Sequence, residues 1–465
     1  MGARALTVAP GLEPPWWLQE APLDSELPPL EGDARADVAV VGGGYTGLWA
    51  ALTLKEREPG LDVCVLEAER CGWGPSGRNG GFLETYWATL PRLVDRLGVD
   101  GALAVTRASE GALAAVRSLG EDVWLREAGM LEVSASPAQD AALERAAETA
   151  RRLGVEEEAV PLSAAELEVR IRSPRFRSGV FFRKVATVQP ARLVRALRRR
   201  ALTAGVRVHE GTRASRIRPG AVEAGRGRVL APEIVVATNA WAAGWRPLAR
   251  QLTPFGSYVV LTEQVPGLLE VIGWVGGEAV VDGRMFLHYF RTTPDGRVLM
   301  GSGSGPIGFD GRIGRRFTHD RASAERAEAG LRSLLPGLAE ARVEEAWGGP
   351  IDVSADHLPV FGTVAGTRIH YGAGYSGNGV GPSWLGGQIL ASLTLGSDDK
   401  WSRLPLVGRR VPPLPPEPIN FLGGSLVRAA MLAVEEADET GRRARPGARL
   451  VASLPRRLGL RVGTR

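Results

Sequence analysis

The first clear pattern in the chain is a strand, a helix and a second strand in close succession. Residues 37–41 form a short apolar run that predicts a buried strand, and residues 48–58 carry apolar side chains at helical spacing. Residues 61–67 are a second run with strand character. The change of period across a stretch of glycines, completed within roughly 30 residues, predicts a βαβ unit.

The same alternation of helix and strand returns later in the chain. Residues 190–217 predict a helix, a glycine stop at Gly205 and then a strand. Residues 233–241 predict a buried strand that ends in small polar residues. Residues 367–396 again show the pattern of a strand followed by a helix. We therefore expect one α/β unit that is assembled from separated segments.

Two stretches have a different character. Residues 129–136 resemble a strand and are followed by a helical segment that ends at Gly154. Residues 246–345 alternate apolar and polar positions as antiparallel strands do, and the Pro294, Asp295, Gly296 turn marks a hairpin among them. This antiparallel block is a second architecture inserted into the first.

Three glycines stand where the first strand gives way to the helix. Gly42, Gly44 and Gly47 are spaced as GxGxxG, and Glu67 follows the last of them by 20 residues. Such glycines permit a tight turn, close approach of a pyrophosphate and close helix packing, while the helix N-terminus attracts the phosphate charge. Glu67 is placed to accept hydrogen bonds from a ribose. This predicts a dinucleotide site without deciding between NAD and FAD.

A second glycine-rich loop, SGRNGG at residues 76–81, decides that choice. It follows Glu67 by about ten residues, where an FAD-binding chain passes close to the flavin end of the extended cofactor. Small residues there allow contact between the backbone and the isoalloxazine ring. The loop therefore favours FAD over NAD, with Arg78 near the pyrophosphate or the ring.

Together these motifs resemble the FAD-dependent D-amino-acid-oxidase-like superfamily, and most closely its branch that contains gamma-glutamylputrescine oxidoreductases. The resemblance also includes the helix and strand over residues 189–212 and the segment GAGYSGNGVGPSWLGGQILASL at residues 372–393. It spans residues 16–405 and implies an α/β fold, in which a discontinuous Rossmann-like FAD-binding domain carries an inserted antiparallel β-sheet substrate domain.

The expected domains follow from the same segments. They are an N-terminal leader at 1–35, the FAD-binding domain at 36–120, 186–245 and 346–405, the substrate domain at 121–185 and 246–345, and a Pro- and Arg-rich tail with a helix at 406–465.

The resemblance also implies which residues hold FAD, bound non-covalently. Glu67 holds the ADP half, Ala214 contacts adenine through its backbone, and residues 374–380 stabilise negative charge on the reduced flavin from a helix N-terminus. The full expected set is Gly42, Gly44, Tyr45, Thr46, Gly47, Glu67, Ala68, Ser76, Gly77, Arg78, Asn79, Gly80, Gly81, Ala214, Gly374, Tyr375, Ser376, Gly377, Asn378, Gly379 and Val380. Cys71, beside the second loop, is expected to be an inert thiol.

Two absences bear on the substrate. Superfamily members that act on small amino acids often place an arginine after a WxG pattern, where it binds the substrate carboxylate through two hydrogen bonds. Here Trp347 begins that pattern and Ile351 stands at the arginine position, while a second such arginine would fall at Gly377. We therefore expect an amine substrate rather than an α-amino acid.

The predicted reaction is oxidation of a primary or secondary amine to an imine by hydride transfer to flavin N5, followed by hydrolysis to an aldehyde. Oxygen or another acceptor then takes the electrons, and Lys184 is the one lysine we can suggest near an oxygen site. An amino-acid oxidase or dehydrogenase is the alternative, as is a flavin-binding subunit or tailoring partner without amine turnover of its own.

Three side chains are candidates for catalysis. Strand alternation puts Phe286, His288 and Phe290 on one face of residues 285–291, opposite Tyr289. His288 and Tyr258 are expected above the flavin, where aromatic side chains supply an apolar pocket. Asn378 replaces the histidine that amine-oxidising relatives commonly carry, which puts a proton-transfer role at that position in doubt.

Charge and cysteine content exclude other classes. The formal charge is +5, but residues 441–465 hold eight arginines and no acid, so the charge without them is −3. A nucleic-acid partner is therefore not expected. Cys64 and Cys71 form no disulfide framework or metal pair, the histidines lack metal-ligand spacing, and no apolar run is long enough to span a membrane. A cytoplasmic monomer or small homo-oligomer is expected.

Overall fold

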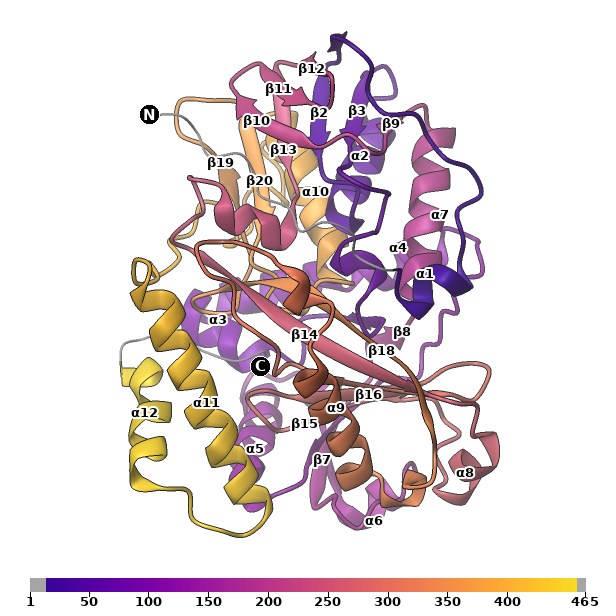
Figure 1. Cartoon of the computed structure of the whole chain (residues 1–465), viewed down its shortest axis with the longest axis vertical. Coiled ribbons are helices and arrows are strands. Elements are labelled where there is room, and N and C mark those ends of the chain that lie inside the picture. The colour runs from indigo at the N-terminus through magenta and orange to yellow at the C-terminus, as the bar shows by residue number, and fades with distance from the viewer. Residues whose placement is uncertain (1–13, 458–465) are drawn as a thin grey trace.

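A six-stranded sheet forms one half of the computed structural model, which describes residues 14–457, and lies in the upper part of Figure 1. Its strands, in the order β19-β20-β13-β2-β3-β9, are Val360–Thr363, Ile369–Ala373, Glu233–Val236, Val38–Val41, Val63–Leu66 and Arg207–His209. All neighbouring strands are parallel except the edge strand β19. Strands β2, β3 and β13 are buried on both faces, which explains their uninterrupted apolar sequences.

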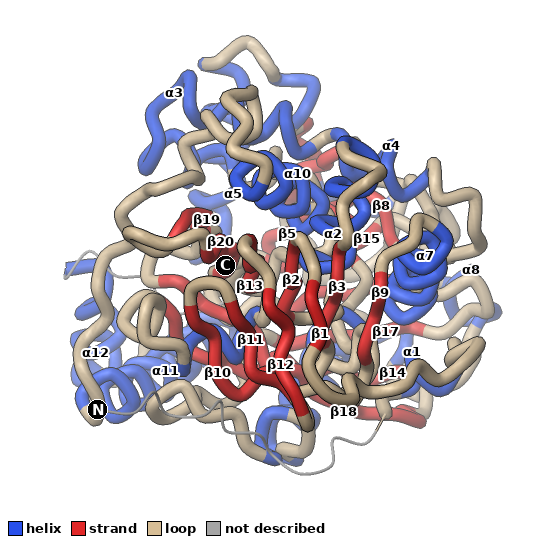
Figure 2. The backbone as a smooth tube through the Cα atoms, turned by 90° about the horizontal axis from the view of Figure 1, so that it is seen from above, coloured by secondary structure: helices blue, strands red, loops and turns tan. Residues whose placement is uncertain are grey.

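Each face of this sheet is covered differently (Figure 2). Helices α2 (Tyr45–Arg57), α7 (Pro190–Thr203) and α10 (Pro382–Thr394) share one apolar core with Val38, Val40 and Val65. The opposite face packs on a small sheet of order β1-β12-β11-β10, formed by Ala34–Arg35, Gly227–Leu230, Ala221–Ala224 and Ala214–Arg218. The expected α/β unit is therefore confirmed, and segments far apart in sequence build it.

A second sheet of eight strands forms the other half of the molecule. Its order is β18-β14-β17-β16-β15-β5-β7-β6, from Val343–Ser354, Leu252–Thr262, Val298–Ser302, His288–Thr292, Ala279–Asp282, Met130–Ser134, Ser178–Phe182 and Val160–Ser163. Every pairing is antiparallel except β15 with β5. That parallel pairing joins the two sequence segments expected to form the substrate domain, and the hairpin between β16 and β17 turns at the expected Pro294–Gly296.

Helices cover one face of the eight-stranded sheet. Helix α9 (Arg321–Leu334) buries Ala327, Leu331 and Leu334 in a core shared with Val298 and Met300. The short helices α6 (Ala164–Glu168) and α8 (Pro266–Val271) contribute Leu167 and Leu269 to that core. Helices α3 (Leu90–Ser109) and α4 (Gly111–Arg117) belong to the core that continues into the first half, and α5 (Pro137–Arg152) packs on β5, β7 and β6. On the other face, α5 covers the end of the sheet formed by β5, β7 and β6, while Ser257, Val281 and Tyr289 face the site.

Two connections join the halves. Strand β18 runs from Val343 to Ser354, across the boundary expected at residue 346, and pairs with β14 along its length. A two-stranded sheet of β4 (Phe82–Glu84) and β8 (Val185–Thr187) makes the second connection. As a result, residues 346–354, which were expected in the FAD-binding domain, are part of the eight-stranded sheet.

The described parts of the leader and tail pack on the body. Helix α1 (Trp16–Glu20) buries Trp17, whose carbonyl accepts a hydrogen bond from Gln189. Helices α11 (Ile419–Glu439) and α12 (Pro446–Arg457) lie beside each other at the left of Figure 1, and Arg284 forms ion pairs with Glu435 and Glu439 of α11. The helix expected in the tail is therefore present, and residues 1–13 and 458–465 lie outside the described part.

Candidate FAD and substrate site

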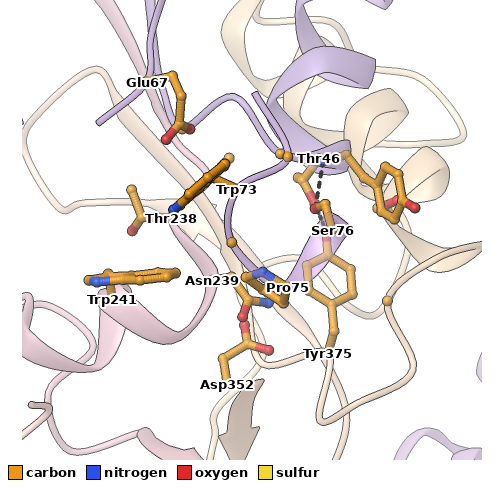
Figure 3. Close-up of a pocket in the computed structure, with 18 of the residues that line it drawn as sticks. Thr46, Glu67, Trp73, Pro75, Ser76, Thr238, Asn239, Trp241, Asp352 and Tyr375 are labelled. Atoms are coloured by element: carbon orange, nitrogen blue, oxygen red, sulfur yellow. Dashed lines mark hydrogen bonds between the residues drawn. The ribbon is translucent and has the colours of Figure 1, made fainter. Parts of the chain in front are cut away.

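The first cavity opens at the carboxyl ends of the parallel strands. Its empty volume is about 1390 Å³, part of which is open to solvent, and it is lined by the residues that follow β2, β3, β13 and β20. Open α/β sheets bind ligands at this edge. Figure 3 shows Thr46, Ser76 and Tyr375 on one side of the cavity, and Glu67, Trp73 and Trp241 on the other.

The GxGxxG glycines fit the cavity to a dinucleotide. Gly42 has φ +110°, and a Cβ there would lie 2.5 Å from the Ala237 carbonyl oxygen. A Cβ on Gly47 would lie 1.9 Å from the carbonyl oxygen of Gly42, so helix α2 reaches the strand only without a side chain there. Gly44 caps the N-terminus of α2 at the cavity wall, where the helix dipole favours phosphate.

Glu67 lies at the end of β3, on the cavity wall. Its carboxylate accepts hydrogen bonds from the backbone N–H groups of Gly43, at 2.7 Å, and Glu69, at 3.0 Å. Burial raises the pKa of Glu67. Each carboxylate oxygen accepts two hydrogen bonds readily, so both retain capacity for ribose hydroxyls.

Side chains of three other segments donate hydrogen bonds to the backbone of the second glycine loop. The indole N–H groups of Trp17 and Trp347 donate to the carbonyls of Asn79 and Arg78, at 3.0 and 2.9 Å. The buried guanidinium of Arg291 donates to the Gly80 carbonyl at 2.7 Å. The described part of the leader thereby helps to fix residues 78–80 against the cavity.

A second cavity, of about 1320 Å³, continues from the first toward the eight-stranded sheet. Residues that line both are Pro75, Asn79, Ile351, Tyr375, Gly377 and Val380. The second cavity adds Leu287, which precedes β16, and Tyr289 of β16, together with Glu84 from β4. A long ligand in the first cavity can therefore present one end to a small molecule in the second.

Most of the expected cofactor residues meet at these cavities. The first is lined by Gly42, Gly44, Tyr45, Thr46, Glu67, Ala68, Ser76, Asn79, Ala214, Tyr375, Gly377, Gly379 and Val380, and the second adds Arg78, Gly80, Ser376 and Asn378.

The remaining four expected residues, Gly47, Gly77, Gly81 and Gly374, line neither cavity. They lie behind the wall, where a Cβ would press on a neighbouring backbone or side chain. A Cβ on Gly77, for example, would lie 2.3 Å from the Gly72 carbonyl oxygen. These glycines shape the cavity rather than contact its contents.

Two of the three catalytic candidates lie away from both cavities. His288 hydrogen-bonds Asp282 through Nδ1 at 2.7 Å, and its ring packs on Gly330 of α9. Tyr258 packs on Gly348 and donates to the Arg316 carbonyl. The expectation that these two act above the cofactor is corrected, because strand alternation turns them toward the helical face while Leu287 and Tyr289 face the cavity.

Asn378 does line the second cavity. Its Nδ2 donates to Glu84 Oε2 at 3.2 Å, and its buried Oδ1 accepts no hydrogen bond. Arg78 is also there, with its Nε donating to the Trp73 carbonyl at 2.9 Å, and burial lowers its pKa to about 10.

Sequence reasoning missed several wall residues. Thr238, Asn239 and Trp241 follow β13, and the position at a parallel strand's carboxyl end was a signal that could have found them. Asp352 and Glu84 carried no such signal. They reach the cavities through the register of β18 and β4, which local sequence does not specify.

Asp352 gives a direct test of whether the first cavity fits a polar cofactor. Its side chain is fully buried, Oδ2 accepts from the Gly374 N–H at 2.5 Å, and Oδ1 has no partner. Burial raises its pKa to about 7. FAD carries hydroxyl and N–H donors that would satisfy such an orphaned acceptor, so the residues present fit the group.

Cys71 and Lys184 also have definite places. The Cys71 thiol is buried beside Gly43, and burial raises its pKa well above the usual range. Lys184 forms ion pairs with Glu110 and Glu158 and lines neither cavity. The structure therefore does not bring Lys184 to the expected oxygen site.

Within residues 14–457, no group of three or more His, Cys, Asp or Glu side chains is arranged to hold a metal ion. No helix in that range is both long and apolar enough to cross a membrane.

The glycine turn, the Glu67 carboxylate on the cavity wall and the two joined cavities are the features expected of a dinucleotide-binding oxidoreductase. Residues 37–393 match the family described as DAO, FAD dependent oxidoreductase. The chain belongs to this family, and it is an FAD-dependent oxidoreductase related to amine and amino-acid oxidases.

Two relatives are similar over most of their length. A probable oxidoreductase OrdL of Rhizobium meliloti (strain 1021) is 29% identical over 437 residues, which are 91% of this chain and 96% of that protein. Gamma-glutamylputrescine oxidoreductase of Escherichia coli (strain K12) is 30% identical over 392 residues, which are 82% and 88%.

Solved structures share the fold. Glycine oxidase from Geobacillus kaustophilus superposes with a TM-score of 0.66 at 22% identity, covering 81% of this chain and 99% of that one. L-proline dehydrogenase from P. horikoshii gives a TM-score of 0.65 at 20% identity, covering 82% and 96%. At this identity the likeness supports the fold alone.

Proposed function

We propose that the protein oxidises a primary or secondary amine to an imine, which water hydrolyses to an aldehyde. The observation that carries the proposal is the wall of the second cavity at the two positions expected to hold carboxylate-binding arginines. Ile351 and Gly377 both line it, so neither position offers a charged partner to an α-carboxylate. The gamma-glutamylputrescine oxidoreductase relative, whose name denotes an amine substrate, supports the same substrate class.

The residues around this cavity suit amine oxidation. FAD, when bound, supplies the acceptor for the hydride that leaves the α-carbon of the amine. Phe82, Leu287 and Tyr289 give the cavity an apolar wall, which excludes water and positions the amine. The Tyr289 hydroxyl is bonded to Ser257 at 2.7 Å, which fixes the ring, and Phe82 packs edge-on against it.

We also propose that FAD is held without a covalent bond. The Cys71 thiol is buried beside the Gly43 backbone and lines neither cavity, and its raised pKa keeps it protonated and unreactive. Acid precipitation of the purified protein should leave the yellow flavin in the supernatant. Flavin retained in the pellet would contradict this. A cytoplasmic location is part of the proposal, supported by the two free cysteines.

One observation favours a second candidate, oxidation of an amino acid. Arg92 lines the second cavity and donates to the His357 carbonyl at 3.4 Å. A guanidinium there offers a substrate carboxylate a partner from a different element.

The test is anaerobic bleaching of the purified flavoprotein by a fixed panel. The amines are n-butylamine, benzylamine, putrescine and N-methylbutylamine, and the amino acids are glycine, D-alanine, L-alanine, sarcosine and L-proline. Loss of flavin absorbance with an amine, and an aldehyde product, are expected. Bleaching by amino acids alone would replace the amine proposal with the second candidate. A bound flavin that no panel member reduces would favour a subunit that needs a partner protein.

A further inference from the structure

Glu84 lies on the wall of the second cavity and has no role in the reaction as proposed above. It ends β4, the strand that leads directly from the SGRNGG loop, and its backbone pairs with Val185 of β8. Its side chain lines the cavity, and Oε2 accepts the hydrogen bond from Asn378 Nδ2. A carboxylate is thus held between the two segments expected to flank the flavin.

The surroundings of Glu84 favour proton exchange near neutral pH. Burial alone raises its pKa to about 7, and no charged neighbour contributes to the shift. A carboxyl group in this range accepts a proton from an ammonium ion more readily than an ordinary glutamate does. The other ionisable side chains on the wall are Arg78, Tyr86, Arg92, Glu132, Asp282, Tyr289, His357 and Tyr375.

Asp282, another acid on this wall, is engaged elsewhere. Its two oxygens bind the backbone N–H and the ring Nδ1 of His288, at 2.9 and 2.7 Å.

Asn378 adds an acceptor beside Glu84. The amide donates to Glu84 through Nδ2, which leaves its buried Oδ1 without a hydrogen-bond donor. Unsatisfied buried acceptors are rare, and an ammonium group carries three N–H donors. One ammonium can therefore satisfy both the Asn378 oxygen and the Glu84 carboxylate.

We propose that Glu84 and Asn378 form the binding site for the substrate ammonium, and that Glu84 accepts its proton before oxidation. In this step one N–H bond breaks and one O–H bond forms, the electron pair stays on nitrogen, and nothing is oxidised. The neutral amine so formed can release a hydride from its α-carbon. Glu84 later returns the proton to water. The inference rests on the proposed amine oxidation and adds the residues that prepare the substrate.

The first measurement is flavin reduction in the holoenzyme by the panel amine that bleaches it fastest. The second-order rate constant of the wild type should rise with pH through about 7, as Glu84 ionises. In Glu84→Gln, the constant at pH 7.5 should fall about 100-fold or more, which is the usual contribution of a positioned base. In this variant, the rate constant should instead rise at about pH 10, where the amine itself loses a proton.

The second measurement does not depend on turnover. tert-Butylamine has no hydrogen on its α-carbon, so it binds as an ammonium ion without being oxidised, and the flavin spectrum reports its binding. The wild-type Kd should fall about tenfold between pH 6 and 8, while that of Glu84→Gln should stay high and constant. Glu84→Asp, which retains a carboxylate, should restore the pH dependence.

Matched variants separate the outcomes. Glu278→Gln removes a buried carboxylate of the same half that lines neither cavity, and should keep the wild-type pH profile. A Kd for tert-butylamine that does not change with pH in the wild type would overturn the inference. The inference would also be overturned if the rate constant of flavin reduction no longer rose through pH 7 in Glu132→Gln but still did so in Glu84→Gln. In either case amine bleaching by the wild type would leave the proposed function standing, whereas bleaching by amino acids alone would overturn both.

Discussion

Asp352 makes the stability of the protein depend on pH in a way that one substitution should remove. The side chain is fully buried, and burial raises its pKa from 3.8 to about 7. The unfolded chain therefore releases this proton at lower pH than the folded chain. The resulting cost to the folded state is absent below about pH 4, grows between pH 4 and 7 and is constant above that.

The size of the cost follows from the shift. Three pKa units correspond to about 4 kcal/mol above pH 7, and about 3 kcal/mol of that appears between pH 5 and 8.5. Asp352→Asn keeps an oxygen for the Gly374 N–H and has no charge to bury. Over that pH range, the free energy of unfolding of the wild-type apoprotein should therefore fall by about 3 kcal/mol relative to Asp352→Asn.

The assay is urea unfolding of both apoproteins at several pH values between 5 and 8.5, followed by circular dichroism. Any fixed effect of the substitution cancels, because only the difference in pH dependence is used. Asp100→Asn, on the exposed part of α3, is the control and should follow the wild type. Parallel curves for wild type and Asp352→Asn would refute the reasoning.

Three further predictions concern the cofactor cavity and the core. Gly47→Ala places a methyl 1.9 Å from the Gly42 carbonyl oxygen, so the Kd for FAD should rise at least about tenfold in a fluorescence titration. Glu67→Gln removes a charged acceptor and should weaken FAD binding by about 1.5 kcal/mol in the same titration, or roughly tenfold. Leu331→Ala, on the buried face of α9, should lower the free energy of unfolding by about 2–5 kcal/mol without changing the flavin spectrum.

Each of these has a clear contrary result. Unchanged FAD affinity in Gly47→Ala would mean that α2 can move away from its strand without loss of the phosphate site. Unchanged affinity in Glu67→Gln would contradict the ribose role expected of that carboxylate. An altered flavin spectrum in Leu331→Ala would show that the helical core under the second sheet is coupled to the cavity on its other face. Gly60→Ala, at an open surface position, is a control for the glycine change.

The cofactor half of the site was predictable because its signals are local. Gly42, Gly44 and Gly47 lie within six residues, and Glu67 lies within the same βαβ unit. Backbone approach to a phosphate requires glycine at fixed spacing, whatever the rest of the fold does.

The substrate half was less predictable, since it depends on strand register and on pairs distant in sequence. Alternation correctly separated Tyr289 from His288, but it did not say which face of the sheet meets the cavity. Glu84 and Asn378 are 294 residues apart, and no local pattern relates them. Asp352 likewise owes its place to the pairing of β18 with β14.

The sequence by itself determined the α/β class, the βαβ unit and the glycine-rich loops that line the cavities, because turn geometry, helix caps and apolar periodicity act over short stretches of chain. Tertiary structure alone decided which side of the eight-stranded sheet α9 covers, and therefore that Tyr289 rather than His288 faces the cavity. It also brought Glu84 to Asn378 and buried Asp352. Burial and the meeting of distant segments set the electrostatics of the site, and both are properties of the packed chain.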